Sequence, residues 1–298
     1  MNIILYKMGD FRNILMVVNP VSGGEEKDNL ITEVRKEVEN KNWKFHLYKT
    51  DGNNDIQKIK QEVDKVEPER MLVVGGDGTI NMVAEALLHK ELPIAIFPAG
   101  SANGLALNLG IPKDRKEQIK IALGDKFTNL DVLQINNQLC LHLSDIGLNA
   151  ELIENYETAA IRGKFGYLMQ TIPTLIKSKY PYEYEVEIDG KIQNHKGIML
   201  AIANCKKYGT GAKINPEGEH DDGKFEILIF KNLDIPEILG TLREEVKFDS
   251  DFAETISTSA AKISCKKPIA FQIDGEFIEN TQNIEVKIAA KSLKIAVK

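Results

Sequence analysis

The chain has 298 residues, of which 43% are hydrophobic and 28% charged, with a formal net charge of −6. This composition excludes a disordered chain and argues against nucleic-acid binding, which requires clustered Lys and Arg. No apolar run approaches the ~20 residues that span a bilayer. The net negative charge implies that any contact with an anionic membrane uses a local patch. The dispersed cysteines, Cys140, Cys205 and Cys265, are typical of a reducing compartment and favour a cytoplasmic location.

Strand and helix patterns alternate over the first 128 residues. Strands are expected at residues 14–18, 44–48, 71–74 and 94–97. Apolar residues at helical spacing lie between them, as at Leu30, Ile31, Val34 and Val38. Strands and helices joined in this order by short loops predict a doubly wound parallel sheet, so we assign residues 1–128 to an α/β domain.

After residue 128, short alternating segments predict a β-rich second domain over residues 129–282. Strands are expected at residues 132–135, 139–143, 184–188, 198–203, 225–230 and 269–273, and in the tail from 283. Asn-Asn and Asp-Gly pairs at 136–137, 189–190 and 274–275 predict tight hairpin turns. A helical pattern over residues 150–178 interrupts the strands, and Pro173 is expected to break it.

Residues 73–79 place three glycines and Asp77 after a buried strand, directly before an amphipathic helix. Glycines permit a sharp turn and close approach of a ligand, and a helix N-terminus suits a phosphate. Asp77 would repel a phosphate, but it makes chemical sense if it holds Mg²⁺. The alternative is a structural turn in which Asp77 and Thr79 only cap the helix.

Two further loops repeat this pattern. Residues 18–24 follow the first expected strand and residues 98–104 follow the fourth, so both lie past carboxyl ends of strands, where open α/β sheets bind ligands. The common nucleotide signatures G-x-x-x-x-G-K-[ST] and G-x-G-x-x-G do not occur. Three polar, glycine-containing loops at one edge favour a nucleotide site over structural turns.

These loops resemble, in order, the motifs of the diacylglycerol kinase catalytic-domain family. The matching runs are Asn19-Pro20-x-Ser22-Gly23, Gly75-Gly76-Asp77-Gly78-Thr79-x-Asn81 and Gly100-Ser101-Ala102-Asn103. The family includes bacterial diacylglycerol kinases, related bacterial lipid kinases, and sphingosine and ceramide kinases. The resemblance continues through residues 146–151, 163–168, 222–225 and 274–276, so it covers nearly the whole chain.

The resemblance implies an α/β nucleotide domain and a β-sandwich-like second domain with the active site between them, and a final strand, residues 283–298, that returns to the first domain. It implies an ATP- and Mg²⁺-dependent lipid kinase that phosphorylates the hydroxyl of diacylglycerol or a related lipid alcohol. Asp77 would organise Mg²⁺ and the phosphates. The residues that the resemblance assigns to ATP are Asn19, Ser22, Thr50, Gly75, Gly76, Gly78, Thr79, Gly100, Ser101 and Asn103.

Asp274 would take the proton from the lipid hydroxyl, with Glu276 close by, because both match the family's Asp-Gly-Glu motif. Without the resemblance, Asp274 reads as an ordinary turn residue, and Asp189-Gly190 is a second copy of the same turn. Phosphoryl transfer needs positioning, a metal and a base aimed at the nucleophile, which this set of residues would supply.

Further roles follow from the resemblance with an open alternative for each. Glu219, Asp222 and the carbonyl of Lys224 match a structural Mg²⁺ site of some bacterial relatives, or form an exposed acidic loop. Glu151 matches acidic residues that touch the lipid headgroup, or is a solvated helix residue. Arg162, Lys164 and Lys177, with Phe165 and Tyr167, are the expected membrane-contact patch, which predicts weak, salt-sensitive, peripheral docking.

The chain departs from the family's pattern at Met82, where a Glu usually follows Asn81, and Glu85 is a possible substitute on the adjacent helix face. Thr50 also lacks the His that commonly follows it. Two alternatives therefore stay open: a soluble-substrate kinase of the NAD kinase type, which shares the Gly-Gly-Asp-Gly run, and a catalytically inactive lipid- or nucleotide-binding relative.

Overall fold

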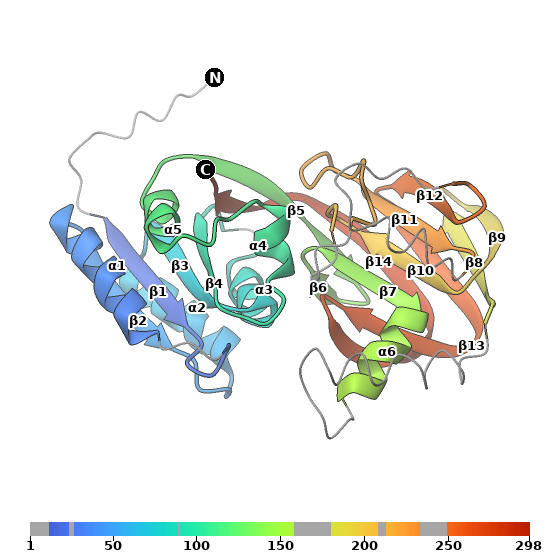
Figure 1. Ribbon diagram of the computed structural model, residues 1–298, viewed down its shortest axis with the longest axis horizontal. Coiled ribbons are helices and arrows are strands. Elements are labelled where there is room, and N and C mark those ends of the chain that lie inside the picture. Colours follow the sequence, from blue (N-terminus) through green and yellow to red (C-terminus); the bar gives the residue numbers. More distant parts are fainter. Residues whose placement is uncertain (1–11, 24–26, 89, 158–179, 208–212, 233–248) are drawn as a thin grey trace. The chain divides into compact units, whose positions relative to one another are not determined.

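The computed structural model describes residues 12–23, 27–88, 90–157, 180–207, 213–232 and 249–298 (Figure 1). These residues form two compact units. Unit 1 consists of residues 1–103, 110–128 and 293–298, and unit 2 consists of residues 104–109 and 129–292. Among the described residues, no helix combines the length and the apolar content needed to cross a bilayer.

Unit 1 is built on a parallel sheet whose inner strands are buried on both faces. Its strands are β1 (Asn13–Val18), β2 (Lys44–Lys49), β3 (Arg70–Gly75) and β4 (Ile94–Pro98). They pair in the order β4-β3-β1-β2. The end of β14 (Glu276–Ala296) adds a parallel partner to β4, where Ile295 pairs with Ile94.

Helices cover both faces of this sheet, as the sequence predicts. They are α1 (Asp28–Asn40), α2 (Asp55–Val66), α3 (Asp77–Leu87) and α5 (Arg115–Ala122). One face packs α1 and α5 against every second residue of β1 and β3, including Met16 and Leu72. The other face carries α2 and α3, which contact each other as well as the sheet. This alternation around the sheet confirms the doubly wound α/β fold.

Unit 2 is antiparallel and β-rich. Its strands are β5 (Phe127–Ile135), β6 (Gln138–Cys140), β7 (Leu143–Gly147), β8 (Tyr182–Ile188), β9 (Lys191–Gly197), β10 (Met199–Ala203), β11 (Phe225–Phe230), β12 (Ala253–Thr258), β13 (Ala260–Ile273) and β14. The unit also contains α4 (Gly104–Asn108) and α6 (Leu148–Glu157). The pairing order is β12-β11-β10-β7-β13-β14, with β8 and β9 attached to β13, and β5 and β6 attached to β14.

The long strand β13 joins two layers of unit 2. Its first half pairs with β8 and its second half pairs with β7, and its register against β14 shifts between Ser264 and Ile269. A strand that changes partner at such an irregularity lets one sheet fold over another. The enclosed core includes Leu200 and Ile202 of β10 and Ile227 of β11. This arrangement confirms the sandwich-like second domain.

The three expected hairpins are present. Residues 136–137 connect β5 to β6, residues 189–190 connect β8 to β9, and residues 274–275 connect β13 to β14. All six turn residues have positive φ, as the type I′ turn requires. The cysteines are also as expected, since Cys140, Cys205 and Cys265 are buried and free.

The strand expected at residues 139–143 is wrong. β6 ends at Cys140 and β7 begins at Leu143, so the chain leaves the extended ladder at Leu141 and His142. The N–H groups of Leu141, His142 and Leu143 bond the carboxylate of Asp274 instead of continuing a single strand. The expected helix over 150–178 is described as α6 from Leu148 to Glu157, and its remainder lies outside the described residues, as does the patch of Arg162, Lys164, Phe165, Tyr167 and Lys177.

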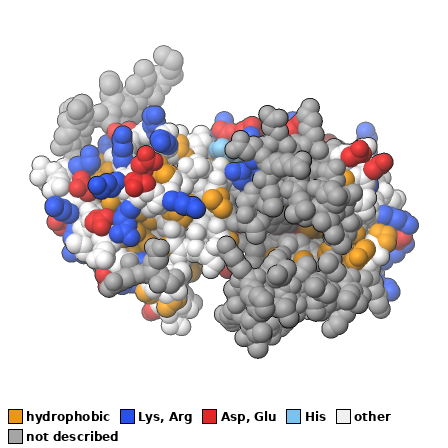
Figure 2. All heavy atoms as spheres, in the orientation of Figure 1, with side chains coloured by type: hydrophobic (Ala, Val, Ile, Leu, Met, Phe, Trp, Pro, Cys, Tyr) orange, Lys and Arg blue, Asp and Glu red, His pale blue; other side chains and the backbone are white. Residues whose placement is uncertain are grey.

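Basic and acidic side chains are interspersed over the face of unit 1 shown in Figure 2. Unit 1 forms several ion pairs, including Lys49 with Asp28, Lys58 with Asp51 and Lys90 with Asp64. These pairs are at least partly exposed, so each contributes at most about 1 kcal/mol to stability.

Candidate functional site

The strand order of unit 1 places its topological switch point, the candidate ligand-binding position, between β1 and β3. These strands are neighbours, but the helix after β1 covers one face of the sheet and the helix after β3 covers the other. In open α/β sheets, ligands bind beyond the carboxyl ends of the strands at such a topological switch point. The loops that the sequence singles out, which begin at Asn19 and Gly75, leave the sheet at this position.

Asn19 ties the loop after β1 to the loop after β3. Its backbone N–H donates to the carbonyl of Val74 at 3.0 Å, and its side-chain Nδ2 donates to Oγ1 of Thr79 at 3.2 Å. Its Oδ1 accepts the N–H of Val21 at 3.1 Å, and its carbonyl accepts the hydroxyl of Ser22 at 3.2 Å. One asparagine therefore organises residues from both loops at the switch point.

The loops after β3 and β4 touch through glycines. A Cβ added to Gly100 would lie 2.4 Å from Cα of Gly76, and a Cβ added to Gly76 would lie 3.0 Å from Cα of Gly100. Larger residues would therefore force the two backbones apart. Asn103 closes the second loop, because its Oδ1 accepts the N–H of Gly100 at 2.7 Å and its Nδ2 donates to the carbonyl of Gly100 at 2.8 Å. Ser101 is exposed beside it.

Thr50 follows β2 at the same edge, where its N–H donates to the carbonyl of Val18 at 2.9 Å. The loop after Thr50 is held by Asp55, which the sequence reading missed. Asp55 accepts the N–H of Gly52 at 2.8 Å and the hydroxyl of Tyr48 at 2.5 Å. Burial and this hydrogen bond raise the pKa of Tyr48, so the phenol stays a donor. The sequence signal that could have identified Asp55 is an acidic residue at the start of a helix, where the helix dipole favours a negative charge.

Lys27 is a second residue missed from the sequence. It is buried, and its Nζ donates to the carbonyls of Pro20 and Ser22. Lysine is rarely buried unless its ammonium group is paired, so these carbonyls and the cation stabilise each other. The ammonium group of Lys27 fixes the backbone of the loop after β1 and places a positive charge next to that loop.

Asp77 and Gly78 begin α3, where the chain leaves β3. Asp77 is half-buried, Gly78 is exposed and Thr79 is buried. The first N–H groups of a helix and its positive dipole end suit an anion such as a phosphate. Met82, which departs from the family's pattern, is half-buried on α3, and Glu85 is exposed.

Asp77 is a suitable Mg²⁺ ligand only if substrate phosphates and water complete the coordination. Among the described residues, no group of three or more His, Cys, Asp or Glu side chains could hold a metal by itself. Mg²⁺ is commonly bound by one or two carboxylates together with substrate phosphates and water. A single carboxylate beside a phosphate-binding edge is therefore a suitable donor set.

The acidic loop of unit 2 offers Mg²⁺ a poorer fit. Glu219 pairs with Nζ of Lys206 at 3.1 Å, and Asp222 accepts the N–H of Lys224 at 2.9 Å. The loop is anchored by Asp131, whose Oδ2 accepts the N–H of Gly223 at 2.7 Å. Each of these carboxylates has a protein partner, so the structural Mg²⁺ site at Glu219, Asp222 and Lys224 stays a prediction.

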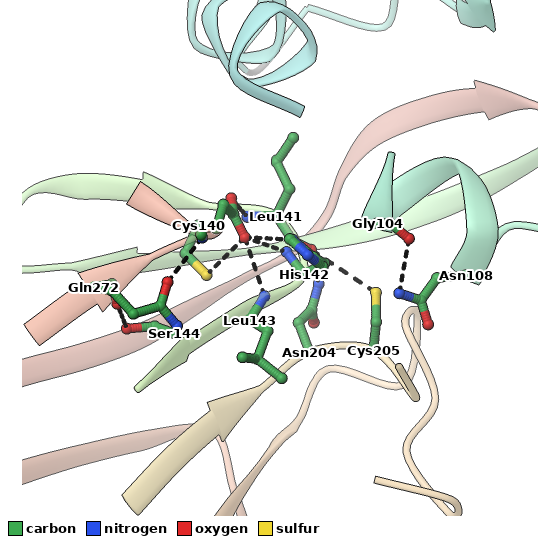
Figure 3. A network of polar contacts seen from close by, with 12 residues as sticks. Gly104, Asn108, Cys140, Leu141, His142, Leu143, Ser144, Asn204, Cys205 and Gln272 are labelled. Carbon is green, nitrogen blue, oxygen red and sulfur yellow. Dashed lines mark hydrogen bonds and ion pairs between the residues drawn. The ribbon is translucent and has the colours of Figure 1, made fainter. Parts of the chain in front are cut away.

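Asp274 lies in a cradle of donors formed by the break between β6 and β7. Figure 3 labels the donor residues Leu141, His142 and Leu143. Its Oδ2 accepts the N–H of Leu141 at 2.7 Å, and its Oδ1 accepts the N–H groups of His142 and Leu143, each at 3.0 Å. The imidazole Nδ1 of His142 lies 2.6 Å from the same Oδ1. The thiol of Cys140 lies 3.5 Å from it.

These donors determine the ionisation of Asp274. Burial alone would raise its pKa, but the imidazole of His142 and the backbone N–H groups lower the pKa below its ordinary value. Burial and the Asp274 carboxylate raise the pKa of the Cys140 thiol well above its usual range. The buried carboxylate is therefore an anion beside a neutral thiol.

A second layer of contacts holds the cradle in place (Figure 3). The side-chain Nδ2 of Asn204 donates to the carbonyls of Leu141 and Asp131, each at 2.8 Å. The carbonyl of His142 accepts the N–H groups of Asn204 at 3.0 Å and Cys205 at 3.2 Å. The backbone of the cradle is thus fixed by the segment that follows β10.

The remaining predicted residues lie elsewhere in unit 2. Glu276, the first residue of β14, is exposed two residues after Asp274. Glu151 lies on α6 and accepts a hydrogen bond from the hydroxyl of Tyr182 on β8. The residues that the resemblance assigns to ATP therefore lie on the loops at one edge of the unit 1 sheet, and the predicted base, Asp274, lies in unit 2.

Comparison with known proteins gives the family. Residues 13–135 match the model of the diacylglycerol kinase catalytic domain, and residues 145–297 match the YegS C-terminal NAD kinase beta sandwich-like domain. The chain belongs to the diacylglycerol kinase catalytic-domain family. Together, the two matches cover the α/β part and the sandwich part of this kinase family, which makes the chain a phosphotransferase.

Relatives match the chain over nearly its whole length. The chain is 26% identical over 296 residues to the probable lipid kinase YegS of Escherichia coli O1:K1 and of Shigella boydii serotype 18, with 96% of each chain covered. Two Bacillus anthracis structures share the fold: a diacylglycerol kinase with a TM-score of 0.76 and 18% identity, and a putative diacylglycerol kinase with a TM-score of 0.77 and 23% identity. Each covers 97% of this chain, and the chain covers 97% and 98% of them.

Proposed function

We propose that the protein is an ATP- and Mg²⁺-dependent lipid kinase that transfers the γ-phosphate to the hydroxyl of diacylglycerol or a related lipid alcohol. The observation that carries the proposal is the convergence of the loops after β1, β3 and β4 at the switch point of a kinase-family sheet. The names of the curated relatives, probable lipid kinases, support a lipid acceptor.

The residues of unit 1 would hold the phosphates of ATP. The N-terminus of α3 and the loops at Gly76 and Gly100 present backbone N–H groups that suit a phosphate. Because the two glycines have no side chains, their backbones lie close together and no side chain of theirs blocks the approach of a phosphate. Asn19 and Asn103 stabilise the conformation of the loops after β1 and β4 through side-chain hydrogen bonds. Asp77 would hold Mg²⁺, which neutralises phosphate charge in such reactions.

Asp274 would accept the proton of the lipid hydroxyl. Its low pKa keeps it ionised, and phosphoryl transfer through a loose transition state demands positioning more than a strong base. The exposed Glu276, two residues later, would add negative charge near the hydroxyl. The cradle of N–H groups gives the carboxylate one fixed orientation.

The decisive experiment offers γ-labelled ATP and Mg²⁺ with a panel of acceptors. We expect label in diacylglycerol or another lipid alcohol presented in mixed micelles, and none in NAD. Label only in NAD would identify a soluble-substrate kinase and overturn the lipid acceptor. ATP binding without transfer to any acceptor would favour the inactive relative, and Met82→Glu would then test whether the family's Glu restores transfer.

We also propose that the protein visits the membrane only transiently to obtain its lipid. A net charge of −6 opposes stable adsorption to anionic vesicles, and contact through the basic residues Arg162, Lys164 and Lys177 would be attractive and would weaken with salt. Sedimentation with phosphatidylglycerol vesicles at low and physiological ionic strength measures this. Binding that persists unchanged at high salt would contradict it.

A further inference from the structure

The break between β6 and β7 brings an imidazole to the proposed base. Nδ1 of His142 lies 2.6 Å from Oδ1 of Asp274, and the side chains of both residues are almost fully buried, at 5% and 6% exposure. The contact joins residues that are 132 positions apart in the chain. It is therefore built by the fold and does not follow from a local turn.

The direction of this hydrogen bond follows from the backbone donors around Asp274, because both carboxylate oxygens already accept N–H groups, Oδ2 from Leu141 and Oδ1 from His142 and Leu143. A carboxylate anion only accepts hydrogen bonds, so Nδ1 of His142 carries the proton that the two atoms share. An anion buried among protein atoms is expensive unless donors replace its water. The backbone supplies three N–H donors to Asp274, and His142 supplies a side-chain donor that also carries charge when protonated.

We propose that His142 is a positioning residue for phosphoryl transfer: its Nδ1–H fixes the orientation of the Asp274 carboxylate and keeps that carboxylate ionised in its buried place. The inference rests on the proposed function, because it takes Asp274 to be the base. It goes beyond that function by naming the residue on which the base depends.

Two thiols also lie near the carboxylate among the residues that the structure describes. They belong to Cys140, on β6, and Cys205, which follows β10. Burial and the Asp274 carboxylate raise the pKa of both thiols, so neither brings charge at neutral pH. The His142 backbone is itself anchored, since its carbonyl accepts the N–H groups of Asn204 and Cys205.

Two substitutions separate the parts of this role. His142→Phe keeps an aromatic ring of similar size but removes the donor and the charge, whereas His142→Asn keeps a neutral donor. The matched control is His195→Phe, because His195 is a half-buried histidine of unit 2 whose side chain is 8% exposed, with Nδ1 3.4 Å from a carboxylate oxygen of Glu254.

The first measurement does not depend on activity. The carboxyl ¹³C resonance of Asp274, assigned by its disappearance in Asp274→Asn, should titrate at higher pH in His142→Phe than in the unsubstituted protein. His142→Asn should give an intermediate value, and His195→Phe should give no change. An unshifted Asp274 titration in both His142 variants would overturn the inference.

The second measurement is the pH dependence of kcat. His142→Phe should lose roughly tenfold in kcat at the acid end of the profile, a part of the ~10² to 10⁴ that a positioned base supplies. The loss should shrink as pH rises, and KM for ATP should stay unchanged. His142→Asn should recover most of the loss. A uniform loss at every pH would mean that His142 only supports the fold.

The two proposals fail in different ways. If Asp274→Asn is inactive and the His142 variants keep the normal profile and titration, the role of His142 is wrong and the lipid kinase stands. If Asp274→Asn keeps full transfer, the assignment of the base fails. If no acceptor is phosphorylated at all, the ¹³C titration still decides whether His142 controls the ionisation of Asp274.

Discussion

Two hairpins of unit 2 turn on the same dipeptide and differ in everything around it. Asp189-Gly190 joins β8 to β9, and Asp274-Gly275 joins β13 to β14. Their backbones are alike, because the two aspartates have φ of 51° and 49° and the glycines have φ of 74° and 90°. Asp189 is exposed, whereas the Asp274 side chain is 6% exposed and is held by donors of a distant segment.

The comparison shows that turn chemistry and site chemistry are separate properties of one residue. An Asp-Gly pair satisfies a type I′ turn in either hairpin. Only the second hairpin lies against the segment between β6 and β7, which has left the β-ladder and donates its N–H groups to the Asp274 carboxylate. The function that we propose for Asp274 therefore depends on the break between β6 and β7, and four substitutions test this dependence.

The largest expected effect is on catalysis. Asn suits the positive φ of both turns, so Asp→Asn changes the carboxylate and spares the turn. Asp274→Asn should reduce transfer by roughly 10³-fold, within the range for a positioned base. Asp189→Asn should stay near normal. A comparable loss in the two variants, measured with labelled ATP, would mean that the choice between the hairpins is wrong.

The next effect is on the free energy of unfolding. Asp274→Asn replaces a carboxylate, whose two oxygens both accept hydrogen bonds, by an amide with one acceptor oxygen and one donor NH₂ group. The buried backbone N–H groups and His142 then lose the negative charge that they contact. Loss of one partner from a buried pair costs about 3 kcal/mol. Asp189→Asn, at an exposed position, should change stability by less than about 0.5 kcal/mol. Urea unfolding at neutral pH measures both, and equal values would contradict the cradle.

A smaller effect appears as acid dependence. The folded pKa of Asp274 lies below its ordinary value, so its ionised form stabilises the folded state. This stability is fully present above the unfolded pKa of about 3.9 and is lost as pH falls through the folded pKa. The stability difference from Asp274→Asn should therefore shrink below about pH 3.9. The difference from Asp189→Asn should stay level over the same range.

The smallest effect should be the same in both hairpins. Gly190 and Gly275 have positive φ, and a Cβ added to either meets no described atom within 4 Å. Gly→Ala at each position should therefore cost about 1 kcal/mol through backbone strain alone. Unequal losses in thermal unfolding would show that the two turns differ in more than their surroundings.

Local sequence patterns predicted the features that arise within a few residues of each other. The glycine loops at Gly76 and Gly100 and the hairpin turns are such features, because they are set by backbone conformations that few residues permit. Strand and helix alternation likewise predicted the α/β unit. The glycine-containing loops that meet at the edge of the unit 1 sheet were thus predictable from the sequence, and their role in binding a nucleotide stays a prediction.

The cradle could not be predicted because it depends on long-range contacts. Alternation at residues 139–143 reads as one strand, and only the approach of Asp274 explains why the chain turns aside at His142. Asp55 and Lys27 were missed for a similar reason, since each acts on a loop through carbonyls, N–H groups or a phenol that carry no sequence signature.

The edge contact between β14 and β4 has a consequence for biosynthesis. Residues 12–103 and 110–128 emerge from the ribosome early, yet the strand that pairs with the outer side of β4 comes from residues 293–298. Until these residues have been made, β4 presents an unpaired edge that can recruit another chain. Unit 1 begins to fold first and is completed last, so fragments that stop near residue 128 should aggregate more readily than the whole chain.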